Sequence, residues 1–180
     1  MAKKTYYYNV KNRSAGIVKY KIPEMNIVRR FVPGETKRIA YDELFALSNQ
    51  PGGRELMANF LQIQSVGAPK SLGIKAEPEY YMSEKDVVEL LKNGSLDAFL
   101  DCLDFAPEGV IELVKKFAVS LPLSDYEKRK ALKEKIGFDV DAAIANAGPE
   151  VVEKAEAART AVSDSTTPGR RTNTNYKVVN

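Results

Sequence analysis

Histidine and cysteine, which carry much of enzyme chemistry, are almost absent from this chain. It has no histidine, and its one cysteine is Cys102. Histidine is the usual general base near neutral pH and the commonest metal ligand, so neither a His-activated nucleophile nor an ordinary zinc site can be built. A single cysteine excludes an internal disulfide, and Cys102 is most simply a small core residue. We therefore expect a protein that is not an enzyme and uses no metal or cofactor.

Acidic residues are the remaining candidates for catalysis. Five of them recur at spacings of 4, 3, 4 and 4 residues: Asp97, Asp101, Asp104, Glu108 and Glu112. On one continuous helix they would form a stripe, although Pro107 is expected to break such a helix. Three interpretations stay open: a solvated helix face, a docking surface for a basic partner, and a carboxylate pair of the kind that glycosidases use.

A glycine-rich segment at residues 51–54 precedes a predicted helix. Free backbone N–H groups at a helix start can bind an anion. The segment lacks the spacing and the Gly-Lys-Ser/Thr ending of a phosphate-binding loop, so a glycine-rich helix start explains it more simply.

Basic and aromatic residues accumulate in the first part of the chain. The candidate surface for nucleic acid or for an acidic partner consists of Arg29, Arg30, Lys37 and Arg38. The tyrosines that could stack on the bases of a single strand are Tyr6, Tyr7, Tyr8 and Tyr20. Alternatively, the tyrosines pack the sheet, and the cations protect strand faces and edges from unwanted pairing.

Residues 163–180 carry the most specific signal for binding. Ser, Thr, Asn, Pro and Gly dominate this tail, which is too polar to fold alone. A charged pair and a polar spacer precede an apolar end, and the predicted contacts are Arg170, Arg171, Tyr176, Lys177, Val178 and Val179. An aromatic and two β-branched residues suit a strand that adds to the sheet edge of a partner. We expect the tail to bind a neighbouring subunit, with an ordinary frayed terminus as the alternative.

The elements that would position these residues predict an α+β fold. Short connections favour an antiparallel meander of strands at residues 6–11, 17–22, 27–32 and 36–40, with a small barrel or a half-sandwich as alternatives. Helices at 42–48 and 54–61 would cover one face of this sheet, and 62–66 would be a last strand. The predicted boundaries are 1–66 for a basic β-rich domain, 67–82 for a linker, 83–162 for an α-helical domain and 163–180 for the extended tail.

Start and stop signals divide the second domain into short helices. Ser83 with Asp86, and Ser124 with Glu127, have the spacing of a capping box. The predicted helix starts, in chain order, are Ser83, Ser95, Pro107, Ser124, Asp139 and Pro149. The predicted ends include Asn93-Gly94, Gly137 and Gly148.

The net charge of +3 conceals a separation of charge along the chain. Residues 1–62 hold 11 Lys/Arg and 5 Asp/Glu, residues 63–163 hold 13 and 18, and residues 164–180 hold 3 and 1. A basic head and an acidic body can attract different partners, or copies of each other. No apolar run approaches the roughly 18 residues that a membrane span needs, and no signal peptide is evident, so no membrane association is expected.

Five short segments together resemble small proteins of tailed bacteriophages. They are residues 8–14 (YNVKNRS), 32–35 (VPGE), 50–54 (QPGGR), 101–109 (DCLDFAPEG) and 176–179 (YKVV). The resemblance spans most of the chain. It implies a phage origin and the role of a virion accessory protein, such as a capsid decoration or head–neck component. It implies no catalytic residues.

The preferred function is therefore that of a structural protein of a phage virion. It would be assembled in the host cytoplasm in many copies, bound to capsid or neck subunits, with its tail on a neighbour. The first alternative is a phage nucleic-acid-binding or regulatory protein that acts through the basic β domain. The second is an enzyme that uses carboxylates.

Overall fold

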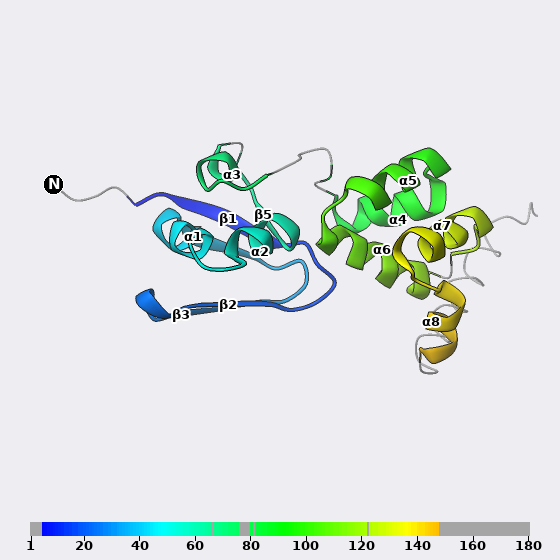
Figure 1. Ribbon diagram of the computed structural model, residues 1–180, viewed down its shortest axis with the longest axis horizontal. Helices are drawn as coiled ribbons and strands as arrows, with labels where there is room; N and C mark the ends of the chain where they lie inside the picture. The colour runs from blue at the N-terminus through cyan, green and yellow to red at the C-terminus, as the bar shows by residue number, and fades with distance from the viewer. Residues whose placement is uncertain (1–4, 66, 76–79, 81, 122, 148–180) are drawn as a thin grey trace, which may run out of the picture.

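The computed structural model describes residues 5–65, 67–75, 80, 82–121 and 123–147. It confirms the α+β class, because two antiparallel sheets with helices come first and a helical region follows (Figure 1). The predicted helix at 150–162 and the tail at 163–180 lie outside the described residues. No helix in the described part of the chain is long and apolar enough to cross a membrane.

The described strands form two sheets rather than the predicted single meander. The first sheet has the order β4-β1-β5, with β1 (Tyr7–Asn12) between β4 (Thr36–Ala40) and β5 (Leu61–Ile63). The second is a hairpin of β2 (Val18–Ile22) and β3 (Ile27–Phe31). All pairs are antiparallel.

Asn12, at the end of β1, explains this departure from a meander. The Asn12 N–H donates to the Glu35 carbonyl at 2.9 Å and the Gly34 N–H to the Asn12 carbonyl at 3.0 Å, so the turn before β4 extends the β1–β4 ladder. The Asn12 side-chain amide donates to the carbonyls of Gly16 at 2.8 Å and Phe31 at 3.3 Å. It thereby fixes the loop that leaves β1 and ties it to the end of β3. The chain crosses to a second sheet before it returns to pair with β1.

Two short helices, α1 (Tyr41–Ser48) and α2 (Gly53–Asn59), lie between the first sheet and the hairpin (Figure 1). The helix predicted at 54–61 is shorter because the chain pairs with β1 from Leu61 onward, and the strand predicted at 62–66 is β5. A Cβ on Gly53 would lie 1.8 Å from the Leu47 carbonyl oxygen, so the glycine-rich start of α2 is a steric requirement.

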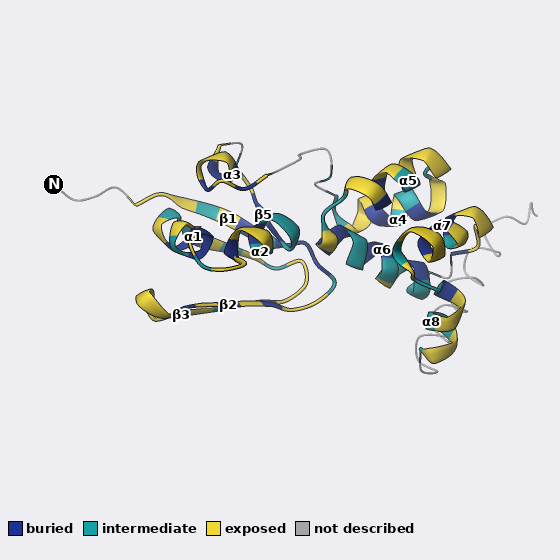
Figure 2. Ribbon diagram, viewed as in Figure 1, coloured by how far each residue is buried: buried dark blue, intermediate teal, exposed yellow. Residues whose placement is uncertain are grey.

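The first core fills the space between these elements (Figure 2). Its largest fully buried side chains are Val10, Ile22, Phe31, Ile39, Leu44, Met57 and Leu61. The core also takes in part of the segment predicted as a linker, where Leu72 and Ile74 are buried after the short helix α3 (Ala68–Ser71). The first unit therefore extends past the boundary predicted at residue 66.

The helical region has a second, separate core (Figure 2). Its elements are α4 (Glu84–Asn93), α5 (Leu96–Phe105), α6 (Glu108–Ser120), α7 (Tyr126–Ile136) and α8 (Val140–Asn146). The fully buried side chains at its centre are Val87, Phe99, Val110, Val114 and Leu132. The last of these helices ends at Asn146 rather than at the predicted Gly148.

Side-chain caps start three of these helices as the sequence predicts. The Ser83 N–H donates to the Asp86 carboxylate at 2.7 Å, and the Asp86 N–H to the Ser83 hydroxyl at 3.4 Å, which forms the capping box of α4. Ser95 and Asp139 accept from the third N–H of α5 and of α8 at 3.2 Å and 3.0 Å. These three predictions are confirmed.

Two predicted helix starts are wrong by one residue. Pro107 is the N-cap of α6 and not its first helical residue. The cap of α7 is Asp125 rather than Ser124, because the Asp125 carboxylate accepts two N–H bonds of the first turn at 3.0 Å and 3.2 Å. A carboxylate interacts more favourably with the positive end of a helix than a hydroxyl does.

A buried lysine joins two helices of the second core. Lys128 of α7 is 2 % exposed. Its ammonium group donates to the carbonyls of Leu90 and Leu91 at 3.0 Å and to that of Gly94 at 2.7 Å. The Leu90 carbonyl also accepts from the Gly94 N–H at 3.1 Å. At this end of α4, Lys128 supplies three further hydrogen bonds and a positive charge.

Candidate partner-binding surface

Cys102 packs as a core residue, as the sequence predicts. Its side chain is buried in the second core, and burial, followed by the charge of Asp101, raises the pKa of the thiol to about 11. The thiol is therefore neutral near pH 7. Among the described residues, no group of three or more acidic or thiol side chains could hold a metal ion.

The five acidic residues are divided between α5 and α6, because the helix break expected at Pro107 is present. On α5, Asp101 accepts a hydrogen bond from the Tyr80 hydroxyl at 2.9 Å. Asp104 forms an ion pair with Lys135 of α7. Both carboxylates are exposed on the helix surface and have structural partners.

The hairpin of β2 and β3 has one apolar and one cationic face. The inward-facing residues of β2 are buried in the first core. The outward-facing residues alternate with them and are exposed. In the ladder, Lys19 lies opposite Arg30, and Lys21 lies opposite Val28. We call these four outward residues the ribbon face: Lys19, Lys21, Val28 and Arg30.

The three cations of the ribbon face have no ion-pair partner among the described residues. Lys19 and Arg30 are directly opposite each other, and like charges at such positions destabilise a sheet. The nearby carboxylate of Glu35 accepts from the Val32 N–H at 2.9 Å and pairs with Lys37 instead. An external anionic surface could remove the repulsion on this face.

The hairpin and its two ends also carry exposed apolar side chains. Val28 is 69 % exposed, the highest value for a large apolar residue in the described part of the chain. Ile17 before β2, Met25 in the turn and Val32 after β3 are also exposed. Cations interleaved with apolar side chains suit a partner that offers both carboxylates and apolar contacts.

Glu43 of α1 holds the hairpin against the helix. It accepts from the Tyr20 hydroxyl at 2.7 Å and from the Arg29 guanidinium at 2.8 Å and 2.7 Å. Burial opposes the charged form of Glu43, but the bonds from Arg29 and then Tyr20 outweigh it and lower the pKa of this carboxyl. Burial, and then the bond to Glu43, raise the pKa of Tyr20, while the bond to Glu43 raises the pKa of Arg29.

The two arginines of β3 do not share a surface. Adjacent residues of a strand point to opposite faces, so Arg29 faces α1 and Arg30 faces outward. Arg29 is paired with Glu43 through Nε and Nη2, and only Arg30 belongs to the ribbon face. The four cations predicted to form one surface therefore do not do so, because Arg29 and Arg30 lie on opposite faces of β3.

The other two predicted cations, Lys37 and Arg38 of β4, belong to the first sheet. Lys37 pairs with Glu35 at 3.3 Å. Arg38 lies over the ring of Tyr7, 4.8 Å from its centroid. Arg38 and Tyr7 are exposed, so a cation and an aromatic ring meet on this sheet, but Tyr20 is buried in the core.

The site residues predicted from the sequence do not include Lys19 and Lys21, although a pattern in the sequence indicates that these lysines are exposed. The alternation of apolar residues and lysines in β2 predicts that both lysines point away from the core. No sequence pattern predicts that Arg29 pairs with Glu43, because Glu43 lies 14 residues away on a helix. Arg170, Arg171, Tyr176, Lys177, Val178 and Val179 lie outside the described residues.

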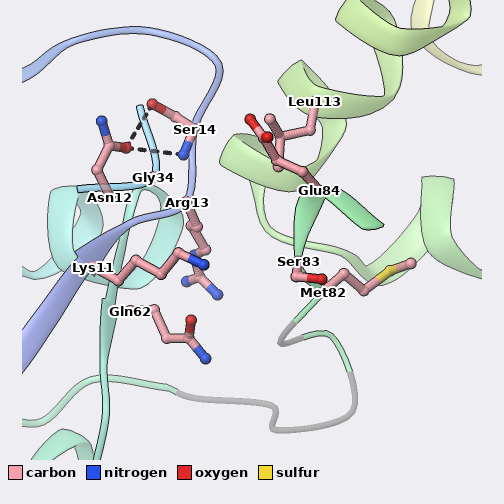
Figure 3. Close-up of a pocket in the computed structure, with 10 residues that line it drawn as sticks. All are labelled: Lys11, Asn12, Arg13, Ser14, Gly34, Gln62, Met82, Ser83, Glu84 and Leu113. Carbon is pink, nitrogen blue, oxygen red and sulfur yellow. Dashed lines mark hydrogen bonds between the residues drawn. The ribbon is translucent and has the colours of Figure 1, made fainter. Parts of the chain in front are cut away.

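A small polar pocket lies where the two units meet (Figure 3). In Figure 3, Lys11, Arg13 and Gln62 approach it from the first unit, and Ser83 and Glu84 from the second. It has room for about one water molecule. The pocket is too small for an organic ligand. It is a packing gap at the contact, here called the seam, between the β-rich unit and the helical unit.

Gly109 of α6 lies close to Arg13 and to the end of α2 at this seam. The Arg13 guanidinium donates to the carbonyls of Ala58 and, at 3.2 Å, Asn59, and so caps the end of α2. A Cβ on Gly109 would lie 2.7 Å from the Asn59 carbonyl oxygen and 3.4 Å from the Ser14 Cβ. The start of α6 therefore approaches the loop after β1 closely because residue 109 is a glycine.

Comparison with protein families, with curated proteins and with solved structures gives no match to this chain.

Proposed function

We propose that this chain is an accessory structural protein of a tailed-bacteriophage virion, a capsid-decoration or head–neck component, and not an enzyme. It would be assembled in the host cytoplasm in many copies. The phage assignment rests on the resemblance of its sequence segments. The observation that carries the binding role is the ribbon face: its three cations have no ion-pair partner in the described part of the chain, and it includes the highly exposed Val28.

The composition of the ribbon face favours a protein partner over nucleic acid. Single-strand binding relies on aromatic side chains beside the cations, and the ribbon face has none. Tyr20 of the same hairpin is buried, and Tyr7 lies on the other sheet with Arg38. Val28 and its exposed apolar neighbours instead provide the desolvated contacts that protein interfaces use.

Nucleic acid is the second candidate, favoured by the three cations of the ribbon face, which pair with no carboxylate among the residues that the structure describes. If they contact phosphates, affinity must fall steeply with salt because each contact releases counterions. We expect little binding of single- or double-stranded DNA at physiological salt. A filter-binding or fluorescence titration that gives tight, salt-sensitive binding would favour this candidate instead.

The tail would add a second, independent contact. Residues 176–179 suit a strand that pairs with a sheet edge. Strands β4 and β5 are edge strands among the described elements, so such edges exist on neighbouring copies of this chain as well as on other subunits. Deletion of residues 164–180 should leave thermal unfolding nearly unchanged but reduce incorporation into particles. Full incorporation of the shortened chain would place the anchor elsewhere.

Mass spectrometry of purified particles tests the proposal directly. The particles should come from the phage that encodes this chain and be separated from host protein on a density gradient. We expect the chain to co-purify at a fixed ratio to the major capsid protein. Its absence from particles, together with abundance in infected cells, would contradict a virion role.

A further inference from the structure

The outer surface of α5 is acidic, whereas the ribbon face is basic. The helix contains three aspartates and no lysine or arginine. Asp97, Asp101 and Asp104 are spaced by one turn each and so share one face. Asp97 has no ion-pair partner among the described residues, whereas Lys135 pairs with Asp104.

Apolar side chains accompany these carboxylates, as they accompany the cations of the ribbon face. Phe105 is 60 % exposed at the end of α5, and Leu96 is exposed at its start. Tyr80 stacks on Phe105 with its ring centroid at 6.4 Å and donates its hydroxyl to Asp101. This contact holds Phe105 and Asp101 in fixed positions on the surface.

The two surfaces also match in spacing. Lys19 and Lys21 are two residues apart on a strand, a step of roughly 6.6 Å. Asp97 and Asp101 are four residues apart on a helix, a rise of about 6 Å. Neighbouring cations of the ribbon face can therefore meet neighbouring carboxylates of α5, and Val28 can meet Phe105 or Leu96.

The ribbon face and α5 of one molecule cannot make this contact. In Figure 1 the hairpin lies at one end of the molecule and α5 at the other, on opposite sides of the seam. The contact must therefore be made between two molecules.

We propose that the ribbon face of one copy of this chain binds the α5 surface of a second copy. The inference rests on the proposed multi-copy function and names the partner of the ribbon face. Because the two contacting surfaces differ, the contact is heterologous, and repetition of it builds a ring or a filament of copies. Ribbon-face cations then lie against the carboxylates of Asp97 and Asp101, which reduces the repulsion between Lys19 and Arg30.

Sedimentation velocity of the purified full-length chain tests this contact. At about 0.02 M salt we expect species larger than the 20.0 kDa monomer, increasing with protein concentration. At about 0.3 M salt, where exposed charges are screened, the monomer should dominate. A monomer at every concentration and salt would overturn the proposal. The proposed function is tested separately, by mass spectrometry of particles, and would not be contradicted by that result.

Two variants, in which charged residues are replaced by uncharged amides, test whether the ribbon face and the α5 surface form the contact. The ribbon variant carries Lys19→Gln, Lys21→Gln and Arg30→Gln. The α5 variant carries Asp97→Asn and Asp101→Asn. Each should raise the concentration needed for association by about tenfold or more, since it removes one side of the contact. Association that survives either variant would show that other surfaces are responsible.

A mixture of the two variants gives the sharpest result. Each variant retains the surface that the other lacks, so an equimolar mixture should form a heterodimer that grows no further. A matched control replaces three exposed lysines elsewhere, Lys70, Lys85 and Lys130, with glutamine and should associate like the wild type. Circular dichroism checks that all variants remain folded. A mixture that stays monomeric, or a control that behaves like the ribbon variant, would overturn the proposal.

Discussion

Glu43 joins the hairpin to α1 through three hydrogen bonds. It is 3 % exposed and holds Tyr20 and Arg29, both on the inner side of the hairpin, against α1. A buried carboxylate is stable only when it is paired with a cation and hydrogen-bonded, and here Arg29 gives two hydrogen bonds and the neutral Tyr20 hydroxyl a third. The same residue explains why Arg29 is unavailable to a partner while Arg30 is free to contact one.

Replacing Glu43 with glutamine should lower the free energy of unfolding by about 2–3 kcal/mol at pH 7, because Arg29 and Tyr20 lose a charged acceptor. The folded-state pKa of Glu43 is lowered, so its stabilisation is present above its unfolded pKa of about 4.3 and is lost as the pH falls through the lower folded value. Urea unfolding between pH 7 and pH 3 measures both effects.

The variant should therefore show a smaller loss of stability on acidification than the wild type. Glu24→Gln, at an exposed residue of the hairpin turn, is the matched control and should behave like the wild type at both ends of the range. An unchanged acid dependence in Glu43→Gln would mean that the buried pair contributes nothing to stability.

At the scale of elements, local signals in the sequence predicted most helices and strands. Capping serines and aspartates place α4, α5 and α8, and alternation places β2 with its lysines outward. Partnerships between elements were not predictable, because they depend on contacts far apart in the chain. The pairing of Tyr8 with Ile39, which makes two sheets out of an expected meander, is one such contact.

Lys128 shows how an element boundary depends on a distant residue. Lys128→Met keeps the length of the side chain but removes the donor for three carbonyls at the end of α4, 34 to 38 residues away. The Leu90 carbonyl keeps its bond from the Gly94 N–H, but the carbonyls of Leu91 and Gly94 lose the donor that Lys128 provides. Loss of a charged donor from buried acceptors is costly, so we expect a loss of about 2–3 kcal/mol in the free energy of unfolding. Lys130→Met, at an exposed residue of the same helix, should change stability by less than about 0.5 kcal/mol. Equal effects of the two substitutions in denaturant unfolding would contradict this role.

At the scale of the whole molecule, two cores meet at a seam that depends on Gly109. The sequence marked the change from β to α structure but gave no sign that the loop after β1 would pack on α6. That contact requires the absence of a side chain at one position of a helix, where glycine is otherwise unfavourable. This requirement comes from the backbone of α2, about 50 residues earlier in the chain, and no local pattern around Gly109 indicates it.

Gly109→Ala should act in opposite directions in the full chain and in the helical unit alone. In the full chain the new Cβ meets the Asn59 carbonyl, and we expect a loss of about 1–3 kcal/mol. In a fragment of residues 80–147, which we expect to fold as a helical unit, alanine should stabilise α6 by up to about 1 kcal/mol. Thermal unfolding followed by circular dichroism measures both. A fragment that is a random coil, or one that loses stability with alanine, would count against two separable units.

The separation of charge along the chain corresponds to two surfaces, a cationic ribbon face and an acidic α5, at opposite ends of the molecule (Figure 1).

Competition for sites in the particle tests the binding role of the ribbon face most directly. Wild-type chain and the Lys19→Gln, Lys21→Gln, Arg30→Gln variant are expressed together during infection, and mass spectrometry measures their ratio in purified particles. We expect the variant at about a tenth of wild-type occupancy, the ratio that a loss of about 1.4 kcal/mol produces. Equal occupancy of the two chains would show that the ribbon face does not bind a partner in the particle.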